Sequence, residues 1–327
     1  MRWLDDIRRF RLSVLGLNRR NQDYVFRYNA REAFLMVDNK IATKVALSTH
    51  GIPVPRSFAV FQVPWDLRRL GWAVRRLEDF VMKPARGSGG GGILVITGRE
   101  NGHFRKSSGA RLTLRDLEDH AADILAGAYS RNQRQDEAML EYRVRPDPVI
   151  GGMSFGGVGD VRVLVLLGVP ILAMLRLPTR RSDGRANLHV GGIGVGIDLS
   201  TGRTSRAWSR EGAVETHPDL GVPLGGVTLP CFSQILEIAA SCHDAAGLGY
   251  FGADVVVDAE HGPMVLELNA RPGLGIQLAN GRGLRPLAEE IERRKPEGLT
   301  VRERVLLGRE VFERTYEDGE GVLRDRR

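Results

Sequence analysis

Apolar residues in the second half of the chain gather in short runs separated by turn signals. The run 161–175 is interrupted by the turn residues 168–170, and the runs 250–257 and 264–268 flank a turn-rich gap. Short apolar runs joined by glycine, proline and aspartate are typical of β-hairpins. The pattern therefore predicts two hairpins, the first with strands at 160–167 and 171–177.

Other segments carry apolar residues at the spacing of a helix. One such set, three or four residues apart, is Leu67, Leu70, Val74 and Leu77. Thr113 with Asp116, and Thr300 with Glu303, have the spacing of capping boxes that open helices. We therefore expect further helices at 38–51, 113–130, 229–246, 287–291 and 301–312, and short strands at 80–83, 93–97, 138–144 and 195–199.

Both ends of the chain are strongly charged. Residues 1–37 are rich in arginine and repeat apolar residues at helical spacing, which predicts a helical N-terminal extension. Two interpretations fit it: an amphipathic helix packed on the body, or an arm that docks an acidic partner. Residues 296–327 are predicted to form a C-terminal helix and a charged tail.

Two carboxylates are predicted to meet across the second hairpin. If Asp258 faces Pro263 across its loop, the ladder places Asp254 opposite Glu267, with Asn269 on the same face. Like charges across a strand pair are destabilising, so folding alone gives no reason for this pair. Three oxygen ligands without His or Cys suit a hard cation such as Mg²⁺. The alternative is a charged pair at a solvated sheet edge.

A run of glycines lies between the strands predicted at 80–83 and 93–97. It formally contains GxGxxG, but a dinucleotide-binding loop leads into a helix, and Ile93 begins a β-branched strand instead. A Walker A loop requires Lys and Ser or Thr where Ile93 and Leu94 stand. The remaining interpretation is a glycine flap whose backbone N–H groups cover a polyphosphate, with the charge of Lys83 at its base.

Two arginines, Arg162 and Arg176, lie within the apolar strands of the first hairpin. A buried, unpaired arginine is costly, so each is expected either to have a carboxylate partner or to face a cleft that holds anions. The glycine-rich loop 151–159 precedes this hairpin. Loops of that length within a compact domain are usually functional or disordered, so we expect it to influence substrate choice.

The composition indicates a folded protein with a basic surface. The chain has 327 residues, of which 42% are hydrophobic, and a formal net charge of +7. This length allows one large or two small domains with a substantial core. Arginine carries most of the charge, because lysine occurs only at Lys40, Lys44, Lys83, Lys106 and Lys295. Those positions are candidates for roles that suit a compact point charge.

The two cysteines and the apolar runs bear on location. Cys231 and Cys242 lie on one predicted helix, about 16 Å apart along its axis, which is too far for a disulfide. Two free thiols favour a reducing, cytoplasmic location. We expect no secretory signal, because 1–10 already carries two aspartates, and no membrane span, because the longest apolar run is too short.

In their order along the chain, these motifs resemble the ATP-grasp carboxylate–amine ligases, and within them the α-L-glutamate ligase homologues, relatives of the enzyme that adds glutamate to a ribosomal protein. The resemblance covers about 38–287 and is carried by FVMKPARGSGGGGILVI, GDVRVLVLLGVPILAMLRLPT, RANLHVGGIGVGIDLSTG and GYFGADVVVDAEHGPMVLELNARPGLGIQLAN. It implies an α+β ATP-grasp fold at 38–295, in which two α+β subdomains, 38–143 and 144–295, hold ATP between them. Most such ligases carry a complete α/β domain before this core, for which 37 residues are too few.

The resemblance also implies roles for individual residues. The phosphates of ATP would contact Lys44 and Lys83 under a flap formed by Gly87, Ser88, Gly89, Gly90 and Gly91. Adenine would bind at a hinge formed by Glu141, Tyr142 and Arg143. The γ-phosphate would lie by Arg176 and Asn187, and the catalytic set would include Arg162 and Arg271. The metal, Mg²⁺ or in its place Mn²⁺, would be held by Asp254, Glu267 and Asn269.

Arg271 follows the second hairpin and directly precedes Pro272, which fixes an extended exit from the strand. Its planar guanidinium suits two parallel hydrogen bonds to a carboxylate substrate. The alternative is an ion pair with a nearby acid such as Glu289 or Glu290.

The implied reaction is phosphorylation of a carboxylate by the γ-phosphate of ATP, followed by attack of an amine on the acylphosphate. Glutamate or a peptide is the expected substrate, and a homo-oligomer is compatible with the sequence. Two other functions remain: an ATP-dependent phosphotransferase, with His189 or His217 as acceptor, and a non-catalytic ATP-binding module. Nucleic acid is not expected as a partner, because the basic stretch 282–295 contains no aromatic residue.

Overall fold

The computed structural model describes residues 10–87, 89–130 and 133–317. They form two compact units. The small unit consists of 38–45 and 54–144, and the large unit consists of 10–37, 46–53 and 145–317. Both combine helices with an antiparallel sheet. The division into 1–37, 38–295 and 296–327 stays a prediction from the sequence.

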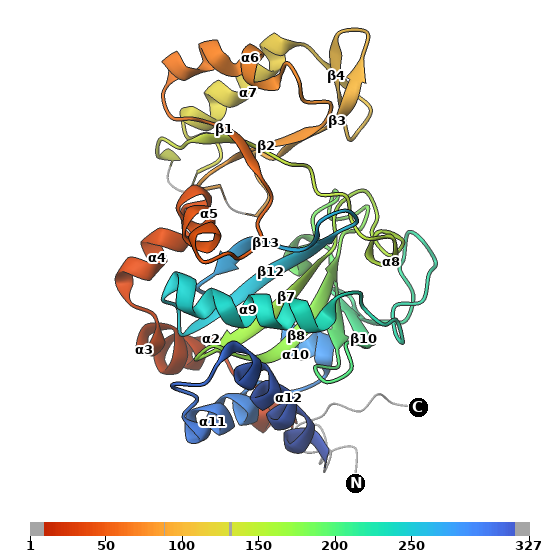
Figure 1. The fold of residues 1–327 in the computed structure, drawn as a ribbon. Helices are drawn as coiled ribbons and strands as arrows, with labels where there is room; N and C mark the ends of the chain where they lie inside the picture. The colour runs from red at the N-terminus through yellow and green to blue at the C-terminus, as the bar shows by residue number, and fades with distance from the viewer. Residues whose placement is uncertain (1–9, 88, 131–132, 318–327) are drawn as a thin grey trace. The chain divides into compact units, whose positions relative to one another are not determined.

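The small unit is built on a six-stranded antiparallel sheet (Figure 1). In spatial order its strands are β1 (Ser57–Phe61), β6 (Ala138–Glu141), β2 (Phe80–Pro84), β3 (Leu94–Glu100), β4 (His103–Lys106) and β5 (Arg111–Leu112). Its helices are η2 (Pro64–Arg69), α6 (Leu70–Val74) and α7 (Leu114–Leu125), and α5 (Lys40–Thr49) contributes its first residues.

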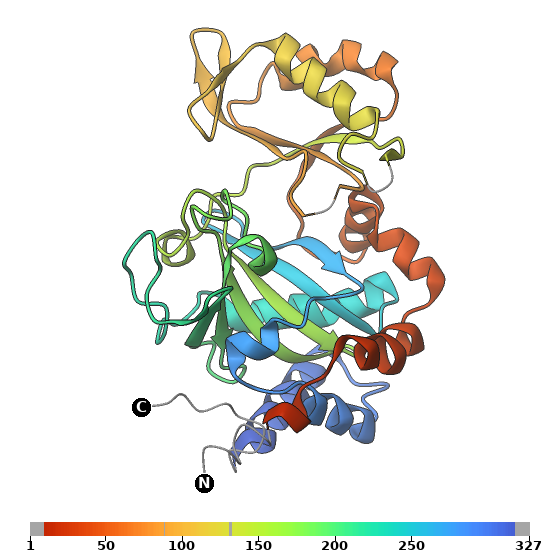
Figure 2. The same ribbon diagram turned by 180° about the vertical axis from the view of Figure 1, so that it is seen from behind.

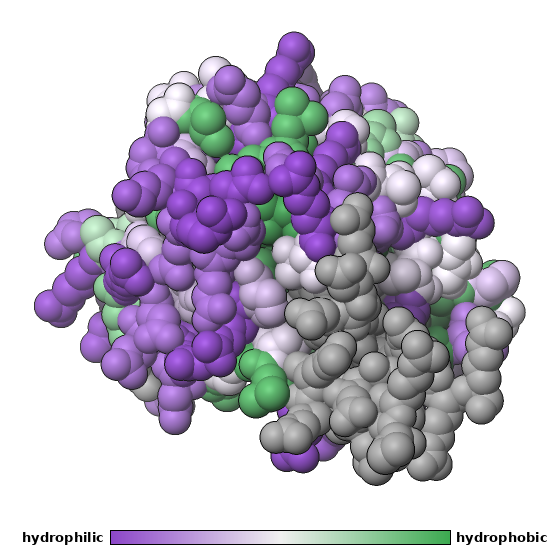
Figure 3. Space-filling view, turned by 90° about the horizontal axis from the view of Figure 1, so that it is seen from below, coloured by the Kyte–Doolittle hydropathy of each residue, from purple (hydrophilic) through white to green (hydrophobic). Residues whose placement is uncertain are grey.

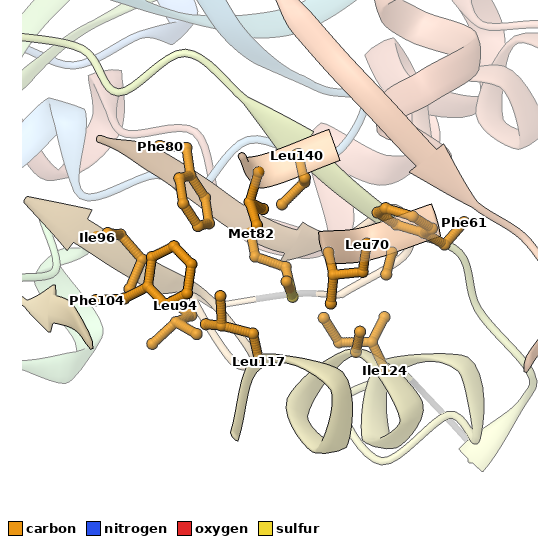
Figure 4. Close-up of a cluster of buried hydrophobic side chains, with 13 residues drawn as sticks. Phe61, Leu70, Phe80, Met82, Leu94, Ile96, Phe104, Leu117, Ile124 and Leu140 are labelled. Carbon is orange, nitrogen blue, oxygen red and sulfur yellow. The ribbon is translucent and has the colours of Figure 1, made fainter. Parts of the chain in front are cut away.

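One face of this sheet packs against the helices to form a core. Figure 4 shows Phe80 and Met82 of β2 on the same side as Leu117 and Ile124 of α7, and all four side chains are buried. Side chains alternate across a strand, so Lys83 lies on the other face of the sheet from this core. The alternation of β2 therefore separates the hydrophobic core from the charged groups.

The large unit is built on a seven-stranded antiparallel sheet. In spatial order its strands are β11 (Gly212–Val214), β10 (Thr204–Ser209), β9 (Ile193–Ile197), β8 (Val169–Leu177), β7 (Asp160–Leu166), β12 (Tyr250–Asp258) and β13 (Gly262–Asn269). Figures 1 and 2 show α9 (Phe232–Ala246) and α10 (Ile276–Asn280) on opposite faces of it. It also contains α8 (Pro148–Gly151), η4 (Leu188–Val190), α11 (Arg285–Arg294), α12 (Val301–Glu317) and the helices of the N-terminal extension.

Both predicted hairpins are confirmed, but the register of the second differs at its loop. Asp258 pairs with Gly262 rather than with Pro263. A β-bulge between Asp254 and Val255 then shifts the ladder by one residue, so that Asp254 does lie opposite Glu267. The predicted pairing is correct because the error at the loop and the unforeseen bulge cancel.

The helix signals are confirmed where a capping box supports them. Thr113 and Asp116 exchange the expected hydrogen bonds at the start of α7, as do Thr300 and Glu303 at the start of α12. The predicted helix 113–130 is too long, since α7 ends before Gly127, whose φ of 84° is left-handed. Strands β1, β4, β5, β10 and β11 and the short helices α8 and α10 were not predicted. Both cysteines are free, as expected.

The described part of the N-terminal extension belongs to the large unit. It forms α2 (Leu17–Arg19), the π-helix η1 (Arg20–Val25), α3 (Phe26–Tyr28) and α4 (Arg31–Val37). The buried amide of Asn29 donates to the carbonyl of Tyr250 at 2.7 Å and accepts from its N–H at 2.9 Å. These contacts agree with the interpretation in which the extension packs on the body. The apolar positions at 4 and 7 lie outside the described residues.

No helix in the described part of the chain is long and apolar enough to cross a membrane. The face seen in Figure 3 is dominated by hydrophilic residues, with hydrophobic ones in small separate groups.

Replacing Asn29 by Ala should lower the free energy of unfolding by about 1–3 kcal/mol, because the buried N–H and C=O of Tyr250 lose their partner. Urea unfolding measures the change. The matched control is Gln22→Ala, an exposed position of the same extension, which should change stability by less than about 0.5 kcal/mol. Equal stability of the Asn29 variant and the wild type would mean that the extension does not support the large unit.

Candidate active site

Two lysines and one glutamate form a buried cluster in the small unit. Lys83 of β2 lies 2.5 Å from one carboxylate oxygen of Glu141, and Lys44 of α5 forms an ion pair with the other. Lys44 also donates to the carbonyl of Pro55 at 2.6 Å. All three charged side chains are at most 7% exposed. The structure thus brings together Lys44, Lys83 and Glu141, which the sequence resemblance had assigned to ATP.

The charges in this cluster do not balance. Burial alone would raise the pKa of the Glu141 carboxyl, but the ammonium groups of Lys83 and Lys44 outweigh it and lower that pKa. Burial lowers the pKa of Lys44 more than Glu141 raises it. One carboxylate therefore serves two buried ammonium groups. A bound anion would relieve this excess of positive charge.

The glycine loop lies between β2 and β3, as predicted. Its carbonyl at Gly87 accepts from Lys40 at 2.6 Å, and its carbonyl at Gly92 contacts the ring of His120 at 3.0 Å. A Cβ atom on Gly92 would lie 2.6 Å from the ring of Tyr129, so only glycine fits there. Gly89 and Gly90 adopt left-handed φ values of 65° and 81°. Ser88 lies outside the described residues.

The predicted hinge follows β6. The N–H of Tyr142 donates to the carbonyl of Arg56 at 2.8 Å, which holds the two chain segments together. The guanidinium of Arg143 pairs with Asp79 at 2.8 Å. Among the predicted hinge residues, Glu141 directs its side chain to the lysine cluster, whereas Arg143 directs its side chain to Asp79. The adenine contact remains a prediction about the backbone here.

The large unit holds a second buried charged network on neighbouring strands. Arg176 of β8 forms two bonds with Asp160 of β7, at 2.7 and 2.8 Å, and a third contact of 2.7 Å with Asp254 of β12. Arg162 of β7 likewise donates two hydrogen bonds to Asp254, one to each carboxylate oxygen. Both arginines are at most 9% exposed. The expectation that each has a carboxylate partner is confirmed.

This network corrects one step of the sequence argument. Folding does provide a reason for Asp254, because its carboxylate neutralises two buried guanidinium groups. Burial would raise the pKa of Asp254, but Arg162 and Arg176 outweigh it and lower that pKa. Burial raises the pKa of Asp160 despite Arg176, and the charge of Asp254 adds to the rise.

The three predicted metal ligands lie together at the β12–β13 pair. Glu267 is directly opposite Asp254, and the amide of Asn269 donates to Asp254 at 3.0 Å. Asp254 is buried, while Glu267 and Asn269 are partly exposed. In the described part of the chain, no group of three or more His, Cys, Asp or Glu could hold a metal ion. The donor set is therefore two acids and one amide, whose chemistry fits an oxygen-binding cation that also takes ligands from elsewhere.

Asn187 and Arg271 complete the predicted set. Asn187 precedes η4 and accepts from Arg176 at 3.0 Å, so this predicted pair is in direct contact. Arg271 is exposed and lies over the rings of Phe34 and Phe26, at 4.9 and 5.8 Å. Glu289 and Glu290, the alternative partners of Arg271, instead pair with arginines of α11. The ion-pair alternative is wrong for the described residues, and the role of Arg271 in binding substrate stays a prediction.

A comparison with protein families gives this geometry its context. The family model for sugar-transfer associated ATP-grasp proteins matches residues 19–293. The chain belongs to the sugar-transfer associated ATP-grasp family. The expected α+β ATP-grasp fold is thereby confirmed. No curated protein matches the chain.

The solved structures that are similar to this chain have low sequence identity to it. The ATP-grasp ligase PsnB complexed with minimal precursor is 19% identical over 82% of this chain and 64% of its own, with a TM-score of 0.44. D-cycloserine synthetase DcsG is 18% identical over 80% and 71%, with a TM-score of 0.44. The D-alanine–D-alanine ligase from Coxiella burnetii is 15% identical over 88% and 62%, with a TM-score of 0.44. The chain thus spans less than two thirds of PsnB.

Sequence reasoning missed several residues that support the candidate site. Asp160 stands at the start of the first predicted strand and was not recognised as the partner of Arg176. Lys40 was noted only as one of five lysines, and its contact with Gly87 gives it a place at the glycine loop. His120 and Tyr129 lie next to Gly92, and no pattern in the sequence indicates this position.

Replacing Asp254 by Asn should destabilise the metal-free protein by about 3–5 kcal/mol, because it removes the carboxylate that pairs with Arg162. Glu267→Gln is the matched control and should cost less than about 1 kcal/mol, since that side chain is partly exposed. Denaturant unfolding in chelator compares them. Equal destabilisation by both changes would contradict this assignment.

The effect of Asp254→Asn on the free energy of unfolding should depend on pH. The pKa of Asp254 is lowered in the folded protein, so its contribution is present above its ordinary value of about 3.9 and is lost as pH falls through the lowered value. The gap between wild type and Asp254→Asn should therefore narrow in acid. A gap that widens in acid would mean that the arginines do not stabilise the ionised carboxylate.

Proposed function

We propose that this chain is an ATP-dependent, ADP-forming carboxylate–amine ligase that works through an acylphosphate. The observation that carries the proposal is the buried cluster of Lys44 and Lys83 around Glu141, which holds two ammonium groups for one carboxylate. Such an excess of positive charge favours a polyanion. Within the ATP-grasp fold, the phosphates of ATP are the anion that fits.

The glycine loop supports a polyphosphate ligand from the same unit. It follows β2, the strand that carries Lys83, and its Gly89, Gly90 and Gly92 adopt left-handed φ values that glycine takes up readily. Backbone N–H groups and lysine are the donors that loops of this kind offer to phosphate oxygens. The contacts of Lys40 and His120 at its two ends hold the loop's borders in place.

The large unit has the opposite charge balance, which suits a cation. Asp160, Asp254 and Glu267 supply three carboxylates against the guanidinium groups of Arg162 and Arg176. Asp254, Glu267 and Asn269 are the side chains that would hold Mg²⁺, with phosphate oxygens completing its coordination. Mg²⁺, when bound, offsets the charge on phosphoryl oxygens during transfer.

The residues of this chain suit positioning rather than covalent catalysis. Arg176 is held on three sides by Asp160, Asp254 and Asn187, so its guanidinium is preorganised. A fixed cation can stabilise charge that develops on a transferred phosphoryl group without reorganising. Arg271 would orient the carboxylate acceptor from its exposed position. The amine then attacks the acylphosphate and releases phosphate.

Glutamate or a peptide remains our proposal for one substrate. It rests on the motif resemblance to the α-L-glutamate ligase homologues, and the family description, sugar-transfer associated, leaves other acids and amines open. The loop 151–159, for which we propose a role in specificity, packs against other segments of the large unit. Its Phe155 N–H donates to Pro178 at 3.2 Å, and Gly157 lies so close to Gly184 that a Cβ would meet its carbonyl at 1.9 Å.

A phosphotransferase is the second candidate, and the contacts of His217 argue against that residue as its phosphate acceptor. The buried ring of His217 accepts from the N–H of Asp219 at 3.2 Å and contacts the carbonyl of Pro178 at 3.0 Å. Both nitrogens are therefore occupied in a structural role. His189 is exposed beside Asn187 and is the remaining acceptor.

Phosphate release tests the ligase directly. Carboxylates and amines, including glutamate and short peptides, are offered in pairs with ATP and Mg²⁺, and phosphate and product mass are measured. Phosphate release that requires both partners, with an amide product and ADP, supports the proposal. A phosphorylated product that is stable without amine would favour the phosphotransferase.

Lys83→Ala should weaken binding of a non-hydrolysable ATP analogue by about 1.5–3 kcal/mol, since a charge-assisted contact with phosphate is lost. Isothermal titration measures the affinity. Lys106→Ala, a partly exposed lysine of β4 in the same unit, is the matched control and should bind the analogue like wild type. Unchanged affinity of the Lys83 variant would remove Lys83 from the ATP site.

Arg271→Lys should raise the KM for the carboxylate or lower kcat, with little change in ATP affinity, because a point charge replaces a two-pronged donor. Steady-state kinetics with each substrate varied in turn provide the test. Arg282→Lys is a control in which another arginine lying over a phenylalanine ring is changed in the same way. An effect of Arg271→Lys confined to ATP affinity, or to melting temperature, would contradict the acceptor role.

A further inference from the structure

Two tryptophans of the small unit are almost fully exposed on one short helical segment. Trp65 in η2 is 71% exposed and Trp72 in α6 is 76% exposed. They are seven residues apart, about two turns of helix, and both belong to the exposed part of the same segment. Large aromatic side chains rarely stand in water without a function, because each exposes much apolar surface.

The buried side of the segment does not require these tryptophans. Leu70 and Val74 are at most 1% exposed in the core, and Leu67 and Leu77 pack against it. This stripe is the one that the helical spacing predicts, and Figure 4 shows its Leu70 within the core that packs on the sheet. The opposite side would fold equally well with small polar residues. The tryptophans therefore need an explanation other than folding.

Four arginines lie close to the tryptophans in the sequence of this segment. Arg68 stacks over the ring of Trp65 at 4.0 Å, and Arg69 pairs with Asp66 at 2.8 Å. Arg75 and Arg76 are exposed, and within the described ranges neither has a carboxylate at ion-pair distance. The segment thus carries two exposed tryptophans and four exposed arginines against the acids Asp66 and Glu78.

Two aliphatic residues extend the apolar part of this side. Val63, just before η2, is 51% exposed, and Leu114, the first residue of α7, is 38% exposed. Leu114 lies next to α6, because a Cβ on Gly71 would be 3.1 Å from its side chain. We call Val63, Trp65, Trp72 and Leu114, with the arginines at 68, 69, 75 and 76, the tryptophan–arginine surface.

We propose that the tryptophan–arginine surface docks the protein on an anionic lipid surface. Tryptophan partitions to the level of lipid headgroups, where its ring meets apolar chains and its N–H meets water. Arginines beside it would meet the negative headgroups, and Val63 and Leu114 would enter the boundary with the acyl chains. Charge complementarity selects anionic over zwitterionic lipid.

Nucleic acid and a second copy of the chain fit this surface less well. Single-stranded nucleic acid needs aromatic faces for its bases, and one face of Trp65 is covered by Arg68. Aliphatic residues such as Val63 offer bases no stacking. A second copy would bring the same arginines against each other, which is repulsive.

Vesicle flotation of the full chain tests the proposal. We expect binding to vesicles of phosphatidylcholine with phosphatidylglycerol, a blue shift of tryptophan fluorescence, and little binding to phosphatidylcholine alone. Trp65→Ser with Trp72→Ser should reduce binding about tenfold or more and remove the shift. Arg75→Gln with Arg76→Gln should reduce it about 25-fold at low salt, since each arginine contributes about fivefold.

Matched variants in the large unit control for general loss of apolar or positive surface. Leu35→Ser with Leu306→Ser removes two side chains that are 69% and 63% exposed, and Arg210→Gln with Arg302→Gln removes two exposed charges. Both should bind vesicles like wild type, and all variants should keep the wild-type melting temperature. Equal binding to both kinds of vesicle would overturn the proposal, as would dimerisation or oligonucleotide binding that requires Trp65 and Trp72 without vesicle binding.

Discussion

The contact of Arg176 with both Asp160 and Asp254 is the constraint on which the large unit depends. It joins β8, β7 and β12 by charged bonds within a sheet whose neighbouring positions are apolar. A buried arginine is tolerated only if its charge is compensated, so the strand register must bring the two acids to it. The same register places Glu267 and Asn269 beside Asp254. Folding and the proposed chemistry therefore share one set of side chains, and Asp254 cannot be assigned to either alone.

Two β-bulges set that register, and they explain what the sequence could and could not predict. Without the bulge at Asp254, the ladder from the loop would place Leu266 opposite it instead of Glu267. The bulge between Leu164 and Val165 has the same effect on the first hairpin and brings Asp160 opposite Arg176. Apolar runs predicted the strands and their pairing. The bulges leave no such pattern, so the partner of Arg176 was not found.

Helix ends could be predicted from neighbouring residues, whereas contacts between charged residues far apart in the sequence could not. A capping box is local, and Thr113 with Asp116 could be read from four residues. The grouping of Lys44, Lys83 and Glu141 joins segments up to 97 residues apart and depends on the order β6–β2 in the sheet. Only the resemblance of whole motifs pointed to it. Contacts between residues far apart in the sequence, such as that of the Asn29 side chain with the backbone of Tyr250, leave no motif that could be recognised.

The N-terminal extension contacts the segment that follows β13, and this segment carries Arg271, the residue proposed to bind the carboxylate substrate. Arg20 donates to the carbonyl of Pro272 at 2.7 Å, while Phe26 and Phe34 stand beside the guanidinium of Arg271. A guanidinium next to aromatic rings keeps its donors for other partners while its orientation is restricted. The extension therefore fixes the residue that we propose to meet the carboxylate substrate. If so, changes at Phe26 and Phe34 should alter acceptor selectivity more than ATP affinity, which would link the N-terminal extension to substrate specificity.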